Sequence, residues 1–82
     1  MEMCLEDKIL KAREILEKHE IPIWTNHTGQ EMGYHHFELN DIMIPSVVFR
    51  DLFEAGIRFY VSTWRKKDGT GRMELVIKDE GY

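Results

Sequence analysis

The sequence predicts an α+β domain made of two αββ units, with a four-stranded antiparallel sheet and both helices on one face. Three observations lead to this prediction: an amphipathic helical pattern over residues 4–19, a regular alternation over residues 57–78, and an internal repeat. The chain has 82 residues, which suits a single small domain spanning 1–82.

The first unit opens with the helix of residues 4–19. Its apolar positions recur at near-helical spacing and are Leu5, Ile9, Ala12, Ile15 and Leu16. Pro22 ends the helix, because the residue before a proline is driven out of the α region. Residues 21–26 then alternate as a short edge strand, with Ile21, Ile23 and Thr25 on one side. Turn chemistry follows over 26–33, and 34–40 form the returning strand.

The second unit opens after a brief apolar run at residues 42–44, which suits a strand or a packed linker. Pro45 and Ser46 begin a helix, and Gly56 stands where a C-terminal cap glycine belongs. The expected buried stripe of this helix is Val48, Phe49, Leu52 and Phe53. Residues 57–78 form a β-hairpin whose turn is marked by Asp68-Gly69.

The repeat has a spacing of 36 residues, the separation of Leu16 from Leu52. The same shift aligns Ile21 with Ile57, Gly33 with Gly69, Glu38 with Glu74, and Leu39 with Leu75, and it places Trp24 on Tyr60. It indicates two αββ halves around a pseudo-two-fold axis. The sheet face away from the helices would then carry Trp24, His36, Tyr60 and Trp64, partly open to solvent.

Composition narrows the class of protein. The chain is 43% hydrophobic and 32% charged, as expected of a globular domain, and no apolar run reaches the roughly 20 residues that span a bilayer. The acidic N-terminus does not resemble a secretory signal. A lone cysteine, Cys4, excludes an internal disulfide framework. These features predict a cytoplasmic protein without a membrane partner, and no motif calls for a cofactor.

Charge is unevenly distributed along the chain. Residues 21–56 carry five acids against one base, whereas residues 57–78 carry six bases against two acids. A bipolar molecule of this kind often meets another macromolecule with one of its poles, although ordinary solubility explains the same pattern.

The histidines do not predict a metal site or an enzyme. Adjacent strand residues point to opposite faces, so His35 and His36 cannot readily bind one ion. Strand parity places His35 toward the core and His36 outward, where Glu38 lies on the same face. This pair could do acid–base work, but such pairs also occur as simple surface hydrogen bonds.

The basic, aromatic hairpin is the best candidate for a partner-binding surface. Exposed aromatic residues anchor interfaces, and basic residues pair with acidic groups. With the aromatic face of the first unit, the predicted partner-binding residues are Trp24, Tyr34, His36, Arg58, Tyr60, Trp64, Arg65, Lys66, Lys67 and Arg72. The plainer reading is that these side chains only cover the outer face of the sheet.

Residues 5–57 contain three short motifs: Gly33-Tyr34-His35-His36-Phe37, Ile44-Pro45 and Ala55-Gly56-Ile57. Together they resemble HicA-type mRNA interferase toxins, which have a fold like that of double-stranded-RNA-binding domains. The resemblance implies a ribonuclease with His35 in the catalytic position, and His36 beside it. Tyr34 stands where that family has serine, and hairpin 57–78 lies outside the pattern.

We therefore expect a small non-enzymatic binding module, an inhibitor or adaptor of the kind found in phages and mobile elements, that covers the surface of a protein partner. One alternative is a HicA-like, histidine-dependent ribonuclease. Another is nucleic-acid binding by hairpin 57–78. Pairing of edge strands, or burial of the aromatic face, would give a homodimer.

Overall fold

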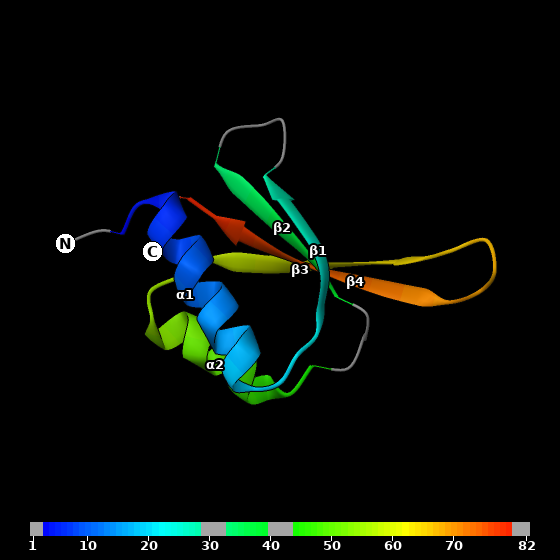
Figure 1. The fold of residues 1–82 in the computed structure, drawn as a ribbon, viewed down its shortest axis with the longest axis horizontal. Helices are drawn as coiled ribbons and strands as arrows, with labels where there is room; N and C mark the ends of the chain where they lie inside the picture. Colours follow the sequence, from blue (N-terminus) through cyan, green and yellow to red (C-terminus); the bar gives the residue numbers. More distant parts are fainter. Residues whose placement is uncertain (1–2, 29–32, 40–43, 80–82) are drawn as a thin grey trace.

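The computed structural model describes residues 3–28, 33–39 and 44–79, and this part of the chain forms two helices and one antiparallel sheet (Figure 1). The elements are α1 (Leu5–Lys18), β1 (Ile23–Thr28), β2 (Tyr34–Leu39), α2 (Ser46–Glu54), β3 (Phe59–Arg65) and β4 (Gly71–Lys78). The strand order is β1-β2-β4-β3, so each αββ unit supplies one edge strand and one central strand. The predicted α+β class is confirmed.

The two units have matching geometry at the spacing of the sequence repeat. Ile21 N donates to Leu16 O at 2.9 Å, and Ile57 N donates to Leu52 O at 3.0 Å, 36 positions later. These bonds close the same type of C-terminal cap on α1 and α2. In the sheet, Glu38 of β2 pairs with its own repeat equivalent, Glu74 of β4. A pseudo-two-fold axis thus passes between the central strands.

Glu20 and Gly56 occupy equivalent positions in the two caps, with φ of 57° and 77° respectively. A non-glycine residue in this left-handed region costs roughly 1–2 kcal/mol, part of which is offset by the lower backbone entropy of its unfolded state. We therefore expect Glu20→Gly to raise the free energy of unfolding by about 0.5–1 kcal/mol in urea titrations. Gly56→Ala is the matched control: a Cβ there meets no atom within 4 Å, so its expected destabilisation reports backbone strain alone.

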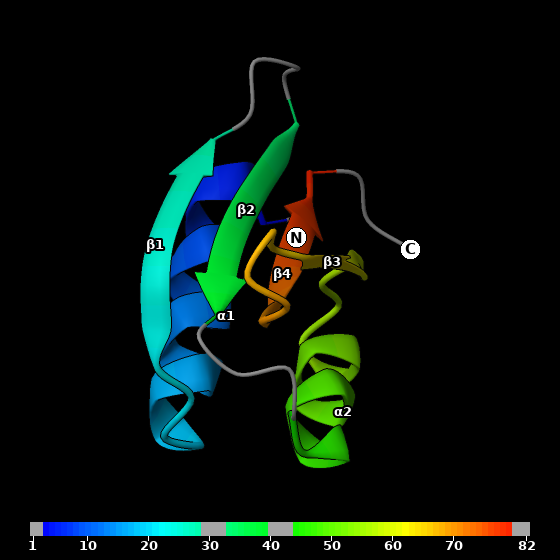
Figure 2. The same ribbon diagram turned by 90° about the vertical axis from the view of Figure 1, so that its right-hand side faces the viewer.

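The core is one cluster of buried residues, most of which come from α1, α2, β2 and β4, and Figure 2 shows how these elements are arranged. The inward strand residues alternate along β2 and β4, as period-two patterning requires. The fully or nearly fully buried members of the cluster are Ala12, Ile15, Leu16, Phe37, Leu39, Val48, Leu52, Ile57, Leu75 and Ile77. Residues of both helices and of the central strands therefore belong to one buried cluster.

One predicted core residue is wrong. Phe53 was expected in the buried stripe of α2, but its side chain is 64% exposed. Each helical residue turns by about 100°, so the residue after the buried Leu52 is carried to the edge of the helix. The aromatic packing of α2 comes instead from Phe49, whose ring stacks on Phe59 at a centroid distance of 5.5 Å.

Two polar contacts join distant segments. His19 Nε2 lies 2.7 Å from Asp51 Oδ2, which links α1 to α2, and this hydrogen bond lowers the pKa of Asp51. Lys8, a buried residue of α1, donates a hydrogen bond from Nζ to the carbonyl oxygen of Asp79, just beyond β4. Within the described residues, neither helix is long and apolar enough to cross a membrane.

The first hairpin differs from its prediction. Residues 26–28 were expected in a turn but continue β1. The expected turn residues 29–32, residue 40 of the expected returning strand, and residues 42 and 43 of the apolar run 42–44 lie outside the described part of the chain. A register shift between Ile23 and Thr25 interrupts the alternation, so Thr25 pairs with Glu38 instead of sharing a face with Ile23. The second hairpin begins at Phe59, two residues later than expected, because Ile57 belongs to the α2 cap.

Candidate functional site

We use the term outer face for the side of the sheet opposite the buried residues Phe37, Leu39, Leu75 and Ile77. Strand register assigns to this face the even-numbered residues of β2, β3 and β4 and, after the bulge, Thr25 and His27 of β1. The side chains concerned are Thr25, His27, Tyr34, His36, Glu38, Tyr60, Ser62, Trp64, Arg72, Glu74, Val76 and Lys78. Five of the ten predicted partner-binding residues are in this list, and Trp24 and Lys66, whose contacts follow, make seven.

At one end of the outer face is a tryptophan patch, formed by Trp24, Trp64, Lys66 and Arg72. Lys66 Nζ lies 4.9 Å from the Trp24 ring centroid, and Arg72 Cζ lies 4.6 Å from it. Trp64 is the strand partner of Arg72. The side chains of Trp24 and Trp64 are 52% and 37% exposed. Cations over an indole face hold that ring in place, so the patch presents large aromatic surfaces at low entropic cost.

At the other end, Tyr34 and Tyr60 meet edge to face at a centroid distance of 6.5 Å, and Lys78 Nζ lies 5.7 Å from the Tyr60 ring. Val76, the strand partner of Tyr60 and of His36, is fully buried although it is on the outer face. Flanking side chains therefore cover the middle of the outer face.

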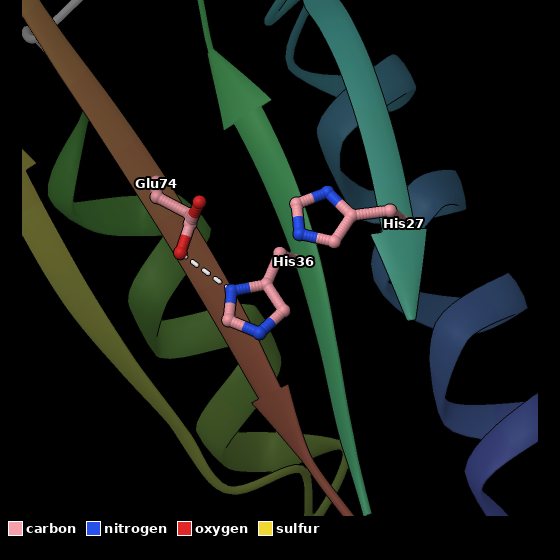
Figure 3. A group of neighbouring side chains, drawn as sticks. All are labelled: His27, His36 and Glu74. Carbon is pink, nitrogen blue, oxygen red and sulfur yellow. Dashed lines mark hydrogen bonds and ion pairs between the residues drawn. The ribbon is translucent and has the colours of Figure 1, made fainter. Parts of the chain in front are cut away.

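Between the two ends lies a cluster from three adjacent strands: His27 of β1, His36 of β2 and Glu74 of β4 (Figure 3). His27 and His36 are strand partners, and their rings stack at 4.8 Å with an interplanar angle of 2°. His36 Nδ1 lies 2.5 Å from Glu74 Oε1, and both side chains are about four-fifths buried. One potential ligand atom from each residue lies within 4.8 Å of the others.

His35 lies on the opposite side of β2 and is 5% exposed. Its Nδ1 is 3.0 Å from Thr28 Oγ1, and its Nε2 is 3.2 Å from Asn26 Oδ1. Both ring nitrogens are therefore hydrogen-bonded within the fold, and its ring edge packs on Phe37. The prediction that His35 turns inward and His36 outward is confirmed.

The environment of His35 favours its neutral form. Burial lowers the pKa of His35 from its ordinary value of 6.5, and the charge of Arg13 lowers it further. The unfolded state then binds more protons just below pH 6.5, so stability is complete above that pH and falls on acidification. We expect the free energy of unfolding to decrease between pH 7.5 and pH 5 in metal-free buffer. In His35→Gln, which has no titrating group at this position, the decrease should be smaller; an unchanged slope would contradict this assignment.

The remaining three predicted partner-binding residues lie outside the outer-face positions of the paired strands. Arg58 precedes β3, and its carbonyl oxygen accepts a hydrogen bond from Lys78 N at 2.9 Å. Arg65, the last residue of β3, has the parity of the inner face. Lys67 lies in the hairpin turn beside Asp68, which accepts hydrogen bonds from Thr70. The bases of residues 57–78 are thus divided among several directions.

Sequence reasoning missed Glu74 and the partnership of His27 with His36. For Glu74, the repeat offered a clue in the sequence, because Glu74 is the repeat equivalent of Glu38. The partnership of His27 with His36 depends on the bulge between Ile23 and Thr25, and no glycine or turn motif marks that bulge in the sequence.

The chain was compared with protein-family models, with curated proteins and with solved structures. No family model, curated protein or solved structure matches the chain. The resemblance to HicA-type toxins therefore remains an expectation from three short motifs, and function has to be argued from the outer face.

Proposed function

We propose that this protein is a small binding module, an inhibitor or adaptor that covers part of a protein partner with its outer face. The observation that carries the proposal is the exposure of Trp24, Trp64 and Tyr60 on one side of one sheet. Tryptophan and tyrosine are the residues most enriched at the energetic centres of interfaces. Three such side chains on one small sheet exceed what solubility requires.

A protein partner suits this face better than a nucleic acid. Nucleic-acid strands are bound along continuous rows of basic residues, with aromatic rings between them. Here Glu38 and Glu74 interrupt the basic side chains, and Arg65 has the parity of the inner face. A surface with acidic groups opposite Lys66 and Arg72 and apolar groups opposite the tryptophans would complement the patch.

The ribonuclease alternative meets a physical objection. A general base must reach the proton that it removes, but His35 is buried and both of its ring nitrogens have partners. This objection applies to His35 and not to His36, whose Nδ1 lies against Glu74. Catalysis by His35 would require the Thr28 and Asn26 contacts to open.

The proposal is tested by capturing partners from a lysate of the source cells with three baits: the wild-type protein, Trp64→Ala combined with Lys66→Ala, and Leu10→Ala. Leu10 is a matched control because it is a large apolar residue, 60% exposed, on α1. We expect one protein, retained after nuclease treatment, with the wild type and Leu10→Ala but not with the patch variant.

The same experiment separates the other candidates. Capture that disappears with nuclease, together with affinity that falls steeply with salt, would favour nucleic-acid binding. Cleavage of RNA by the purified protein that is lost in His35→Ala or His36→Ala would favour the ribonuclease. Equal recovery of the partner by all three baits would overturn the proposed role of the patch.

A further inference from the structure

We propose that His27, His36 and Glu74 bind a zinc ion that fastens the edge strand β1 to the centre of the sheet. The cluster crosses three neighbouring strands on the outer face, and it is separate from the tryptophan patch on which the proposed function rests. Two imidazoles and a carboxylate are a ligand set that suits zinc, with the remaining coordination position left to water.

The backbone brings these ligands together. His27 and His36 are directly opposed in the β1–β2 register, and such partners have Cβ atoms only about 4.5–5.5 Å apart. Glu74 lies diagonally from His36, because the residue opposite His36 on β4 is Val76. The three side chains therefore start from positions within reach of a common point, as Figure 3 shows.

The bulge in β1 is what places His27 on this face. Before it, Ile23 pairs with Leu39; after it, Thr25 pairs with Glu38. If the first register continued, His27 would oppose His35 and point toward the core. Bulges often re-aim a side chain next to a functional site, and here the re-aimed residue is the third member of the cluster.

Imidazole nitrogens bind a metal in the plane of the ring, so the distances allow coordination once the His27 ring rotates out of its stack on His36. Zinc–nitrogen and zinc–oxygen distances near 2.0–2.1 Å place neighbouring tetrahedral ligands about 3.3 Å apart. The three ligand atoms now lie within 4.8 Å of one another, and His36 Nδ1 and Glu74 Oε1 are 2.5 Å apart. Zinc would replace the proton shared by this pair. His27 is exposed on the edge strand, so its ring can rotate toward the ion.

The site would act on an edge strand that has little burial of its own. After Ile23, every residue of β1 is exposed, whereas β2 and β4 have buried faces. A bond from His27 through zinc to the two central strands would resist fraying of β1. Since the unfolded chain lacks the arranged ligands, binding would also raise the stability of the fold.

The test uses full-length, tag-free protein freed of metal with a chelator and titrated calorimetrically with zinc chloride. We expect one ion per chain and a melting temperature that rises by about 10 °C or more at zinc concentrations 100 times Kd. Slower amide hydrogen exchange in β1 would show where the ion acts. Cobalt(II) should give the visible absorption of a tetrahedral site.

Matched variants assign the ligands. His27→Ala and His36→Ala should each weaken zinc binding by more than the roughly 100-fold that loss of an outer-shell partner can cost. His19→Ala, which removes an imidazole from α1, should bind as the wild type. Glu74→Gln should lose about tenfold or more. Its control, Glu38→Gln, makes the same change at the paired position on the same face.

Three results would overturn the proposal: no saturable binding by the wild type, binding that survives in the double variant of His27 and His36, or equal losses in Glu38→Gln and Glu74→Gln. Because none of these variants alters the tryptophan patch, failure of zinc binding would leave the proposed partner surface intact. Loss of partner capture would likewise leave the metal site intact.

Discussion

Phe37→Ala is expected to remove a large share of the free energy of unfolding of the protein. Phe37 is fully buried on the inner face of β2, in the cluster that joins the sheet to both helices. Phenylalanine-to-alanine changes in such positions cost about 3–5 kcal/mol, through lost burial and the cavity left behind. A domain of this size has a total stability of only about 4–12 kcal/mol, so this one change removes a large share of it.

The measurement is urea denaturation followed by far-ultraviolet circular dichroism, with Phe53→Ala as the matched control. Phe53 undergoes the same chemical change on the neighbouring helix, but its side chain is 64% exposed. We expect a loss below about 1 kcal/mol for this control. Similar losses at the two positions would show that the core is not centred on the inner face of β2.

The second large effect concerns binding through the tryptophan patch. Once a partner is in hand, Trp24→Ala and Trp64→Ala should each weaken its affinity by at least about 2 kcal/mol, roughly 30-fold in Kd. Both rings are exposed before binding, and Trp24 is positioned by Lys66 and Arg72, so little entropy is lost on association. Calorimetry or surface plasmon resonance would measure the change.

Leu10→Ala on α1 is again the control for that experiment, since it removes exposed apolar surface from another side of the molecule. The melting temperature of each variant should be measured as well, because Trp24 also lies on an edge strand. Wild-type affinity in both tryptophan variants, with the fold intact, would remove the patch from the interface and direct attention to the tyrosine end of the outer face.

Much of the fold could be predicted because the signals are local. Apolar spacing predicted α1 and its buried residues, and Gly56 marked the end of α2 with its positive φ. The repeat aligned Glu38 with Glu74, and only the structure showed that these two residues pair across the central strands. The burial predicted for Phe53 was wrong, because apolar spacing alone does not say which residue at the edge of a helical stripe contacts another element.

The site could be predicted only where strand parity was unbroken. Tyr60, Trp64 and Arg72 share the outer face, as the alternation of the second hairpin indicated. In the first hairpin, a single bulge reversed the parity of the residues after Ile23, which moved Thr25 away from the core side and turned His27 outward. Arg58 and Arg65, near in sequence to the patch, proved to lie apart from it.

The sequence by itself determined the α+β class, the two-unit repeat and the division of His35 and His36 between faces, because each depends on the period of a helix or strand. Only the tertiary structure decided which distant residues meet. Register and the bulge brought His27, His36 and Glu74 together and folded Lys66 and Arg72 over Trp24. Such pairings depend on how strands align across the sheet, and a one-residue shift reverses every side chain that follows it.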